Sequence, residues 1–270
     1  MKAIRDIYKL NIDEPFKQLF TQGMITHKTY KNKKGDWVMP KEIAHIDGKF
    51  INIHTKEDLI EGPTEKMSKS KKNVIEPNEI LENYGIDSTR IFMISDSPPD
   101  RELEWTDEGI QSSKNLIHRI ERYFSKDKSE INNETVKQIE KYVYEMEKNI
   151  LNFSLNKCVA NIYTLFNFLE KTKIYLKDNN LSKKILICMY PILPRLTAII
   201  YKDLFGKIIN KSLWPEVDSD LLVEDELVLP IQIKGKLVTT VVTKKDYNEN
   251  ELLNSLYQLD KIKSKLVDKN

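Results

Sequence analysis

The feature that most constrains the fold is the long stretch from residue 108 to residue 205, where apolar side chains recur at helical spacing. Intervals of three and four residues place such side chains on one face of a helix. Three such faces are formed by Leu116, Ile117, Ile120 and Phe124; by Ile139, Val143, Met146 and Ile150; and by Leu155, Val159, Ile162, Phe166 and Leu169. A fourth helix is expected over residues 182 to 205, bent by Pro191 and Pro194. Because the connections are short and polar, we expect an antiparallel helical bundle.

The segment before the bundle predicts a mixture of helices and strands. Residues 1 to 24 indicate two helices, and "GMITHKTY" after them is typical of a strand. Asp13 is expected to cap the second helix, with Pro15 in its first turn and Gly23 at its end. The apolar face of that helix would consist of Phe16, Leu19 and Phe20.

Turn signals divide the rest of this segment. "AHIDGKFINIH" predicts a hairpin around its Asp-Gly turn. "IEPNEILENYG" predicts a short helix that Gly85 closes. The next helix should begin at Asp87 or Ser88 and stop at Pro98 and Pro99.

Beyond Trp214 and Pro215 the apolar spacing changes to a period of two. "LVLPIQIKGKLVTTVVT" predicts two strands with Lys-Gly at the turn, and "NENELLNSLYQLDKIKSKL" predicts a helix. A hairpin and one helix bury too little apolar surface to form a stable core by themselves.

Composition excludes several classes of protein. The chain is 40% hydrophobic and 31% charged, and it has no apolar run near the roughly 20 residues of a spanning helix, so we expect no membrane segment. Cys158 and Cys188 form no CxxC pair, which predicts no bound metal and a reducing, cytoplasmic setting. The eight glycines form neither GxGxxG nor GxxxxGK, so an ordinary dinucleotide fold or P-loop is not predicted.

The stretch "GPTEKMSKSKKNVIEP", residues 62 to 77, is the strongest candidate for chemistry. Two lysines three residues apart can place two ammonium groups around a polyphosphate, and the neighbouring serines add hydroxyl donors. The same spacing is common in solvated basic turns. Spacing alone therefore leaves both interpretations open.

The full string resembles a known signature. "KMSKS", residues 66 to 70, is identical to the second signature of class I aminoacyl-tRNA synthetases, and "KKNVIEPNEILENYGIDSTRIFMI" is similar to the extension that follows it in the family. Within the class, residues 13 to 31, 95 to 120 and 213 to 237 resemble leucyl-tRNA synthetase of the bacterial type.

The resemblance implies an α/β fold joined to an all-α part. Residues 1–107 would be the C-terminal half of a Rossmann-like catalytic domain, with the KMSKS loop and a stem-contact region. Residues 108–212 would be a helical, anticodon-binding-type bundle that binds tRNA. Residues 213–270 would be a small, incomplete α/β domain.

The resemblance also implies roles for individual residues. Lys69 would stabilise the α-phosphate of ATP during leucyl-adenylate formation, and Lys66 would assist at the pyrophosphate. The implied ATP-binding residues are Lys66, Met67, Ser68, Lys69 and Ser70, with backbone of Gly23 and Met24 at the adenine edge. Mg²⁺ would arrive with ATP, and no protein-bound metal is implied.

Outside the loop, Asp87 and Arg90 are expected to form a structural pair behind it. Trp105 and Trp214 are expected to pack at domain junctions, and Cys158 to lie in the core. The four histidines show no ligand spacing. The lysines between 171 and 184 fit either tRNA phosphate contacts or a solvated helix face.

The implied function is that of a leucine–tRNA ligase, with leucine, ATP and tRNA-Leu as substrates. The first class I signature, HIGH, does not occur in the sequence, nor does the editing insertion of the family. Met1 falls where the family reads on, which predicts a C-terminal portion that is inactive without a complementary N-terminal polypeptide. The alternatives are a tRNA-binding module without catalysis and an inert fragment of a split or truncated synthetase.

Overall fold

The computed structural model describes residues 1–12, 14, 16, 19–96, 98, 100–222, 226–233, 235–244, 247–259 and 262. The chain divides into two compact units, Met1–Glu216 and Val217–Asn270. The expected roles of Asp13, Pro15 and Pro99, and the end of the expected C-terminal helix, lie outside the described residues.

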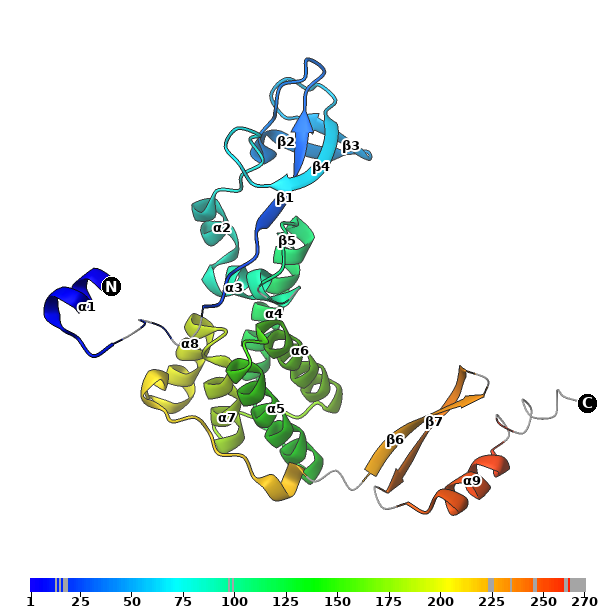
Figure 1. Cartoon of the computed structure of the whole chain (residues 1–270). Coiled ribbons are helices and arrows are strands. Elements are labelled where there is room, and N and C mark those ends of the chain that lie inside the picture. Colours follow the sequence, from blue (N-terminus) through cyan, green and yellow to red (C-terminus); the bar gives the residue numbers. More distant parts are fainter. Residues whose placement is uncertain are drawn as a thin grey trace, which may run out of the picture. The chain divides into compact units, whose positions relative to one another are not determined.

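A small sheet forms the scaffold of the first unit (Figure 1). Its strands are β1 (Ile25–Lys31), β4 (Ile60–Lys66) and β5 (Leu103–Glu104), in the order β4-β1-β5. Strand β1 pairs antiparallel with β4 and parallel with β5. A short 3-10 helix, η1 (Pro40–Glu42), leads into the expected hairpin of β2 (Ile43–Ile46) and β3 (Lys49–Asn52). Both turn residues, Asp47 and Gly48, have the positive φ that this tight turn demands.

The N-terminal region departs from the expectation. Helix α1 (Lys2–Tyr8) forms, but the described residues between 14 and 24 contain no second helix. Phe16 and Leu19 remain 78% and 84% exposed, and of the expected apolar face only Phe20 has a ring contact among the described residues, stacking on Phe153 at a centroid distance of 5.4 Å. Near the expected helix end, the Met24 carbonyl accepts a hydrogen bond from the Leu103 amide at 2.9 Å. This bond continues the pairing of β1 with β5 by one residue before β1 begins.

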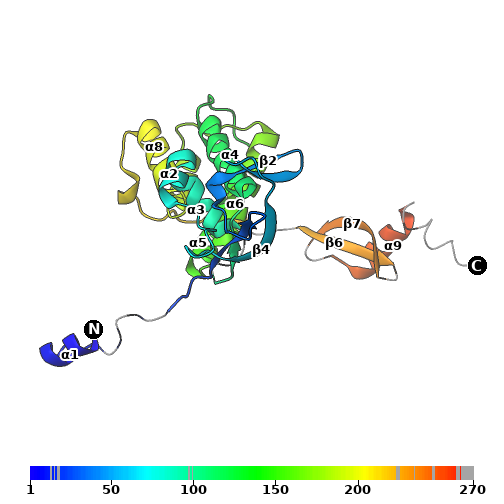
Figure 2. The same cartoon turned by 90° about the horizontal axis from the view of Figure 1, so that it is seen from above.

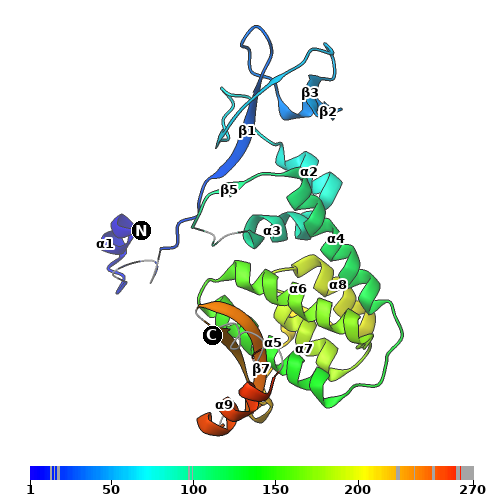
Figure 3. The same cartoon turned by 90° about the vertical axis from the view of Figure 1, so that its right-hand side faces the viewer.

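Helices α2 (Pro77–Tyr84) and α3 (Ile86–Ser95) confirm the expected helix pair, with Gly85 at positive φ between them. Figure 3 shows α2 and α3 between the sheet and the bundle. Phe92 of α3 packs edge-on against Trp105, at a centroid distance of 4.9 Å. Together with Leu103 and Ile110 these rings form the core beneath β1.

The bundle contains α4 (Asp107–Phe124), α5 (Asn133–Leu151), α6 (Leu155–Thr172), α7 (Asn180–Met189) and α8 (Pro194–Phe205). The predicted faces are buried: Ile120, Ile139, Val143, Met146, Ile162, Phe166 and Leu169 are all 0% exposed. The prediction of a single bent helix over residues 182 to 205 was wrong, because this segment forms two helices, α7 and α8. Pro194 begins α8 as its first residue, where a missing amide hydrogen costs nothing.

Two short 3-10 helices, η2 (Ile209–Lys211) and η3 (Ser219–Leu222), follow the bundle. The second unit contains the expected antiparallel strands β6 (Glu226–Ile233) and β7 (Lys236–Lys244), which lie side by side (Figure 2), and α9 (Glu249–Gln258). In the part of the chain that the structure describes, no helix has the length and apolar character needed to cross a membrane.

Candidate functional site

The lysine loop, defined here as residues 66 to 73, leaves the end of β4 and leads to α2. Its start is fixed to β1, because the Met67 amide donates to the Ile25 carbonyl at 3.3 Å. The Met67 side chain packs against the core that contains Phe92 and Trp105. The loop therefore begins at a partly buried residue that is fixed to β1, rather than as a free turn.

The strand before the loop lies unusually close to β1. The Thr29 hydroxyl donates to the Pro63 carbonyl at 3.0 Å, and a Cβ on Gly62 would lie 2.6 Å from the Thr29 hydroxyl oxygen. The register between the strands shifts at this point. Glycine permits the close approach, and Pro63, on the edge strand β4, lacks the donor that such an edge leaves unpaired.

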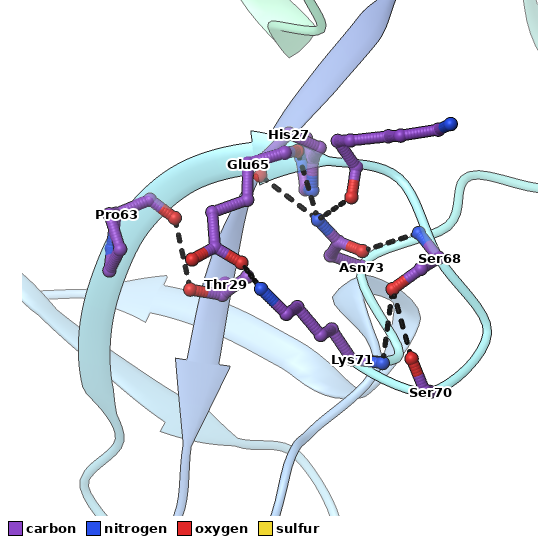
Figure 4. Close-up of polar contacts among 9 residues, drawn as sticks. His27, Thr29, Pro63, Glu65, Ser68, Ser70, Lys71 and Asn73 are labelled. Carbon is purple, nitrogen blue, oxygen red and sulfur yellow. Dashed lines mark hydrogen bonds and ion pairs between the residues drawn. The ribbon is translucent and has the colours of Figure 1, made fainter.

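Asn73 organises the end of the loop (Figure 4). Its side chain is 1% exposed. Its amide nitrogen donates to the carbonyls of His27 at 3.2 Å, Glu65 at 3.2 Å and Lys66 at 3.4 Å. Its side-chain oxygen accepts from the Ser68 amide at 2.9 Å. No role was predicted for Asn73 from the sequence, although it lies within the extension that resembles the synthetase family.

The lysines of the loop fall into different environments. Lys71 forms an ion pair with Glu65, which ties the far side of the loop back to β4. The side chains of Lys66 and Lys69 are exposed, and neither ammonium group has a polar partner among the described residues. Both ammonium groups of the expected pair are thus available to a ligand, whereas the charge of Lys71 is neutralised.

The serines of the loop interact locally. The Ser68 hydroxyl accepts from the Lys71 amide at 3.3 Å and lies 3.3 Å from the Ser70 hydroxyl. Lys72 has a φ of 52°, and its amide donates to the Lys69 carbonyl at 3.3 Å. This turn brings Lys69 and Lys72 to the same side of the loop, where both line a cavity.

That cavity has a volume of about 550 Å³ and is bounded by the hairpin, β1 and α2. Tyr30, Phe50 and Trp105 supply aromatic walls, and Asp107 contributes a carboxylate. His27 also lines it; burial lowers the pKa of His27, so its ring is neutral near pH 7. The cavity could not be predicted from the sequence, because its walls come from segments more than fifty residues apart.

Gly23 and Met24 lie next to the anchor of the loop, directly before Ile25. A Cβ on Gly23 would lie 1.8 Å from the Arg101 carbonyl oxygen, so no larger residue fits there. The Met24 carbonyl is already bonded to Leu103, whereas its side chain is 37% exposed. The structure brings both residues close to the start of the lysine loop through the bond between Ile25 and Met67.

Asp87 and Arg90 do not form the expected ion pair among the described contacts. Asp87 is 5% exposed and accepts from the amides of Leu196 at 2.6 Å and Arg195 at 3.4 Å. Arg90 donates to the carbonyls of Ile192 at 3.2 Å and Pro191 at 2.9 Å. The reason is the break between α7 and α8, whose terminal backbone groups need partners. Burial raises the pKa of Asp87, and the two amide hydrogen bonds oppose that shift.

The other residues singled out from the sequence lie in the core or in ion pairs within the protein. Trp105 is buried in the core, and Cys158 and Cys188 are buried free thiols. Of the lysines between 171 and 184, Lys177 pairs with Asp127 and Lys184 pairs with Glu140. Over the described ranges, no three His, Cys, Asp or Glu side chains are grouped so that they could hold a metal ion.

Two family models match the chain. Residues 49–106 match the family of class I tRNA synthetases (I, L, M and V), and residues 132–251 match the anticodon-binding domain of tRNA ligases. The first match contains the lysine loop, and the second contains α5 to α8.

Curated relatives and a solved structure extend these matches. The chain is 36% identical to the leucine–tRNA ligase of Zymomonas mobilis, and the match covers 93% of this chain and 30% of the relative. It is 33% identical to the leucine–tRNA ligase of Rickettsia typhi, over 99% of this chain and 34% of the relative. A LeuRS of Agrobacterium radiobacter, solved as a ternary complex with tRNA and LeuAMS, aligns with a TM-score of 0.64 at 22% identity, over all of this chain and 32% of that one. The chain spans about a third of the length of these proteins.

Proposed function

Because this chain belongs to the leucine–tRNA ligase family of class I aminoacyl-tRNA synthetases, we propose that its lysine loop binds the polyphosphate of ATP during leucine activation. Lys69 is the cation at the α-phosphate, and Lys66 is the cation at the pyrophosphate. Positioned charges of this kind act where negative charge develops in the transition state.

The observation that carries this proposal is the exposure of Lys66 and Lys69 on a loop that is otherwise tied down. Met67 and Asn73 anchor its two ends, and Glu65 neutralises Lys71. Free ammonium groups on a held backbone are pre-organised for a polyanion. Ser68 and Ser70 add hydroxyl donors. We further propose that the backbone of Gly23 and Met24, beside the start of the loop, meets the adenine edge of ATP. Mg²⁺ binds with the ATP phosphates, which supply its ligands.

The rest of the chain suits contact with tRNA-Leu. The match of residues 132–251 to an anticodon-binding domain supports tRNA binding by the helical bundle. We assign residues 1–107 to the catalytic part, 108–212 to the tRNA-binding bundle and 213–270 to a small α/β part. The cytoplasm is the compartment in which these substrates meet.

The full reaction needs the other two thirds of the ligase, because this chain covers only 30–34% of the relatives. We therefore propose that leucine activation and transfer need the remaining two thirds of a leucine–tRNA ligase, on the same polypeptide or on a complementary one. A second candidate, a tRNA-binding module without catalysis, is favoured by the anticodon-binding match alone. An inert fragment would bind neither ATP nor tRNA.

Titration of the full chain with inorganic triphosphate tests the loop directly. Lys69→Ala should weaken binding about tenfold or more, because it removes a charge-assisted phosphate contact. Lys33→Ala is a matched control, since Lys33 is an exposed lysine in a turn that does not line the cavity. Equal loss of affinity in both variants would refute a specific role for the loop. Leucine-dependent pyrophosphate exchange by the pure chain would refute the need for a complement.

A further inference from the structure

The most thoroughly buried polar group of the lysine loop is the side chain of Asn73, at 1% exposure. A buried amide is stable only when its donors and its acceptor find partners. Asn73 meets that condition with three carbonyl acceptors and one amide donor, all of them from the main chain. Its contacts are therefore independent of neighbouring side chains.

These four contacts join three separate segments. The His27 carbonyl belongs to β1, the carbonyls of Glu65 and Lys66 end β4, and the Ser68 amide lies inside the loop. Ser68 lies between Lys66 and Lys69 in sequence. A fixed Ser68 amide and a fixed Lys66 carbonyl determine the direction in which the main chain leaves β4 and enters the loop.

Two other side-chain contacts of the loop are weaker constraints. The Glu65–Lys71 ion pair is about one-third exposed on both sides, so solvent and salt screen it. The contact between the Ser68 and Ser70 hydroxyls is exposed to solvent. Among the described residues 66 to 73, Asn73 alone is buried.

We propose that Asn73 is a positioning residue, which holds the loop backbone so that Lys66 and Lys69 face a bound polyphosphate together. It does not touch the phosphates; it acts through the main chain of Lys66 and Ser68. The phosphate part of this inference rests on the proposed function of the loop. The geometric part, that Asn73 sets the loop conformation, does not.

The experiment compares the full wild-type chain with Asn73→Ala, with two measurements. Amide hydrogen exchange at Ser68 reports the conformation of the loop, and titration with inorganic triphosphate reports its binding competence. Asn52→Ala is the matched control. Asn52 is 8% exposed and accepts from the amides of His54 and Thr55, so it also holds a turn through its side chain, but in the hairpin.

Asn73→Ala should speed exchange at Ser68 about tenfold or more and weaken triphosphate binding by a similar factor, because the loop then samples many conformations. Asn52→Ala should change both by no more than about twofold. Unchanged exchange at Ser68 in Asn73→Ala would overturn the inference. If Asn73→Ala does not fold, Asn73→Ser is judged by the same criteria. A wild-type chain that binds no triphosphate would refute the proposed function, whereas exchange at Ser68 would still decide the role of Asn73.

Discussion

Replacing Asp87 by alanine should loosen the junction between α3 and the bundle. The carboxylate accepts the Leu196 amide at 2.6 Å and the Arg195 amide at 3.4 Å, both in the first turn of α8. Hydrogen bonds to a charged group contribute about 1.5–3 kcal/mol each to stability, and the longer bond, to Arg195, lies at the weak end of hydrogen-bond geometry. Burial raises the pKa of Asp87, so the desolvation of its carboxylate offsets part of the stabilisation from these two hydrogen bonds. The expected net loss is therefore about 2 kcal/mol, at the upper end for a helix cap.

Thermal unfolding followed by circular dichroism measures this loss. For a unit of this size, about 2 kcal/mol corresponds to a decrease in Tm of about 4–8 °C. Asp87→Asn keeps one acceptor oxygen and should lose about half as much. Asp96→Ala is the control, because Asp96 is exposed at the other end of the same helix. An unchanged Tm in Asp87→Ala, or an equal decrease in Asp96→Ala, would refute the reasoning.

Two further predictions concern the core and the titration of the site. Ile162 is 0% exposed at the centre of the bundle, so Ile162→Ala should lower the free energy of unfolding by about 2–5 kcal/mol in urea denaturation; a loss below about 1 kcal/mol would contradict the packing described. Burial lowers the pKa of His27 below its ordinary value of 6.5, so the unfolded chain binds the proton more tightly than the folded chain. The contribution of His27 to stability is therefore fully present above pH 6.5 and is lost as the pH falls towards the folded pKa. Urea midpoints at pH 7.5 and 5.5 should differ less in His27→Gln than in the wild type; an equal or larger difference would contradict this assignment.

The sequence predicted the elements whose signals are local. The helical faces of the bundle, the Asp-Gly hairpin and the helix closed by Gly85 all formed as expected. Spacing of three and four residues is set by the helix itself, and a tight turn needs only its own residues. The KMSKS string, together with the extension that follows it, likewise indicated the loop without any knowledge of what packs against it.

The missed features depend on residues distant in sequence. The break between α7 and α8 is stabilised by Asp87 and Arg90, which lie about a hundred positions earlier. An amphipathic helix needs a surface to cover its apolar face. Among the described residues between 14 and 24 no helix forms, and Phe16 and Leu19 stay exposed rather than covered. Periodicity alone does not reveal whether such a surface exists.

The same limit applied to the candidate site. Asn73 stood within the recognised extension, but its partners come from β1 and β4, which meet only after the strands pair. The division of the lysines into a neutralised Lys71 and the exposed Lys66 and Lys69 also depends on where Glu65 lies.

Leucine-dependent exchange of pyrophosphate into ATP tests the central claim most directly. The assay combines this chain with a polypeptide that carries the other two thirds of a leucine–tRNA ligase, and compares the wild type with Lys69→Ala. Exchange should require both polypeptides, and Lys69→Ala should lower it about a hundredfold or more, as expected for a charge that stabilises the transition state. Exchange that persists unchanged in Lys69→Ala would contradict the account.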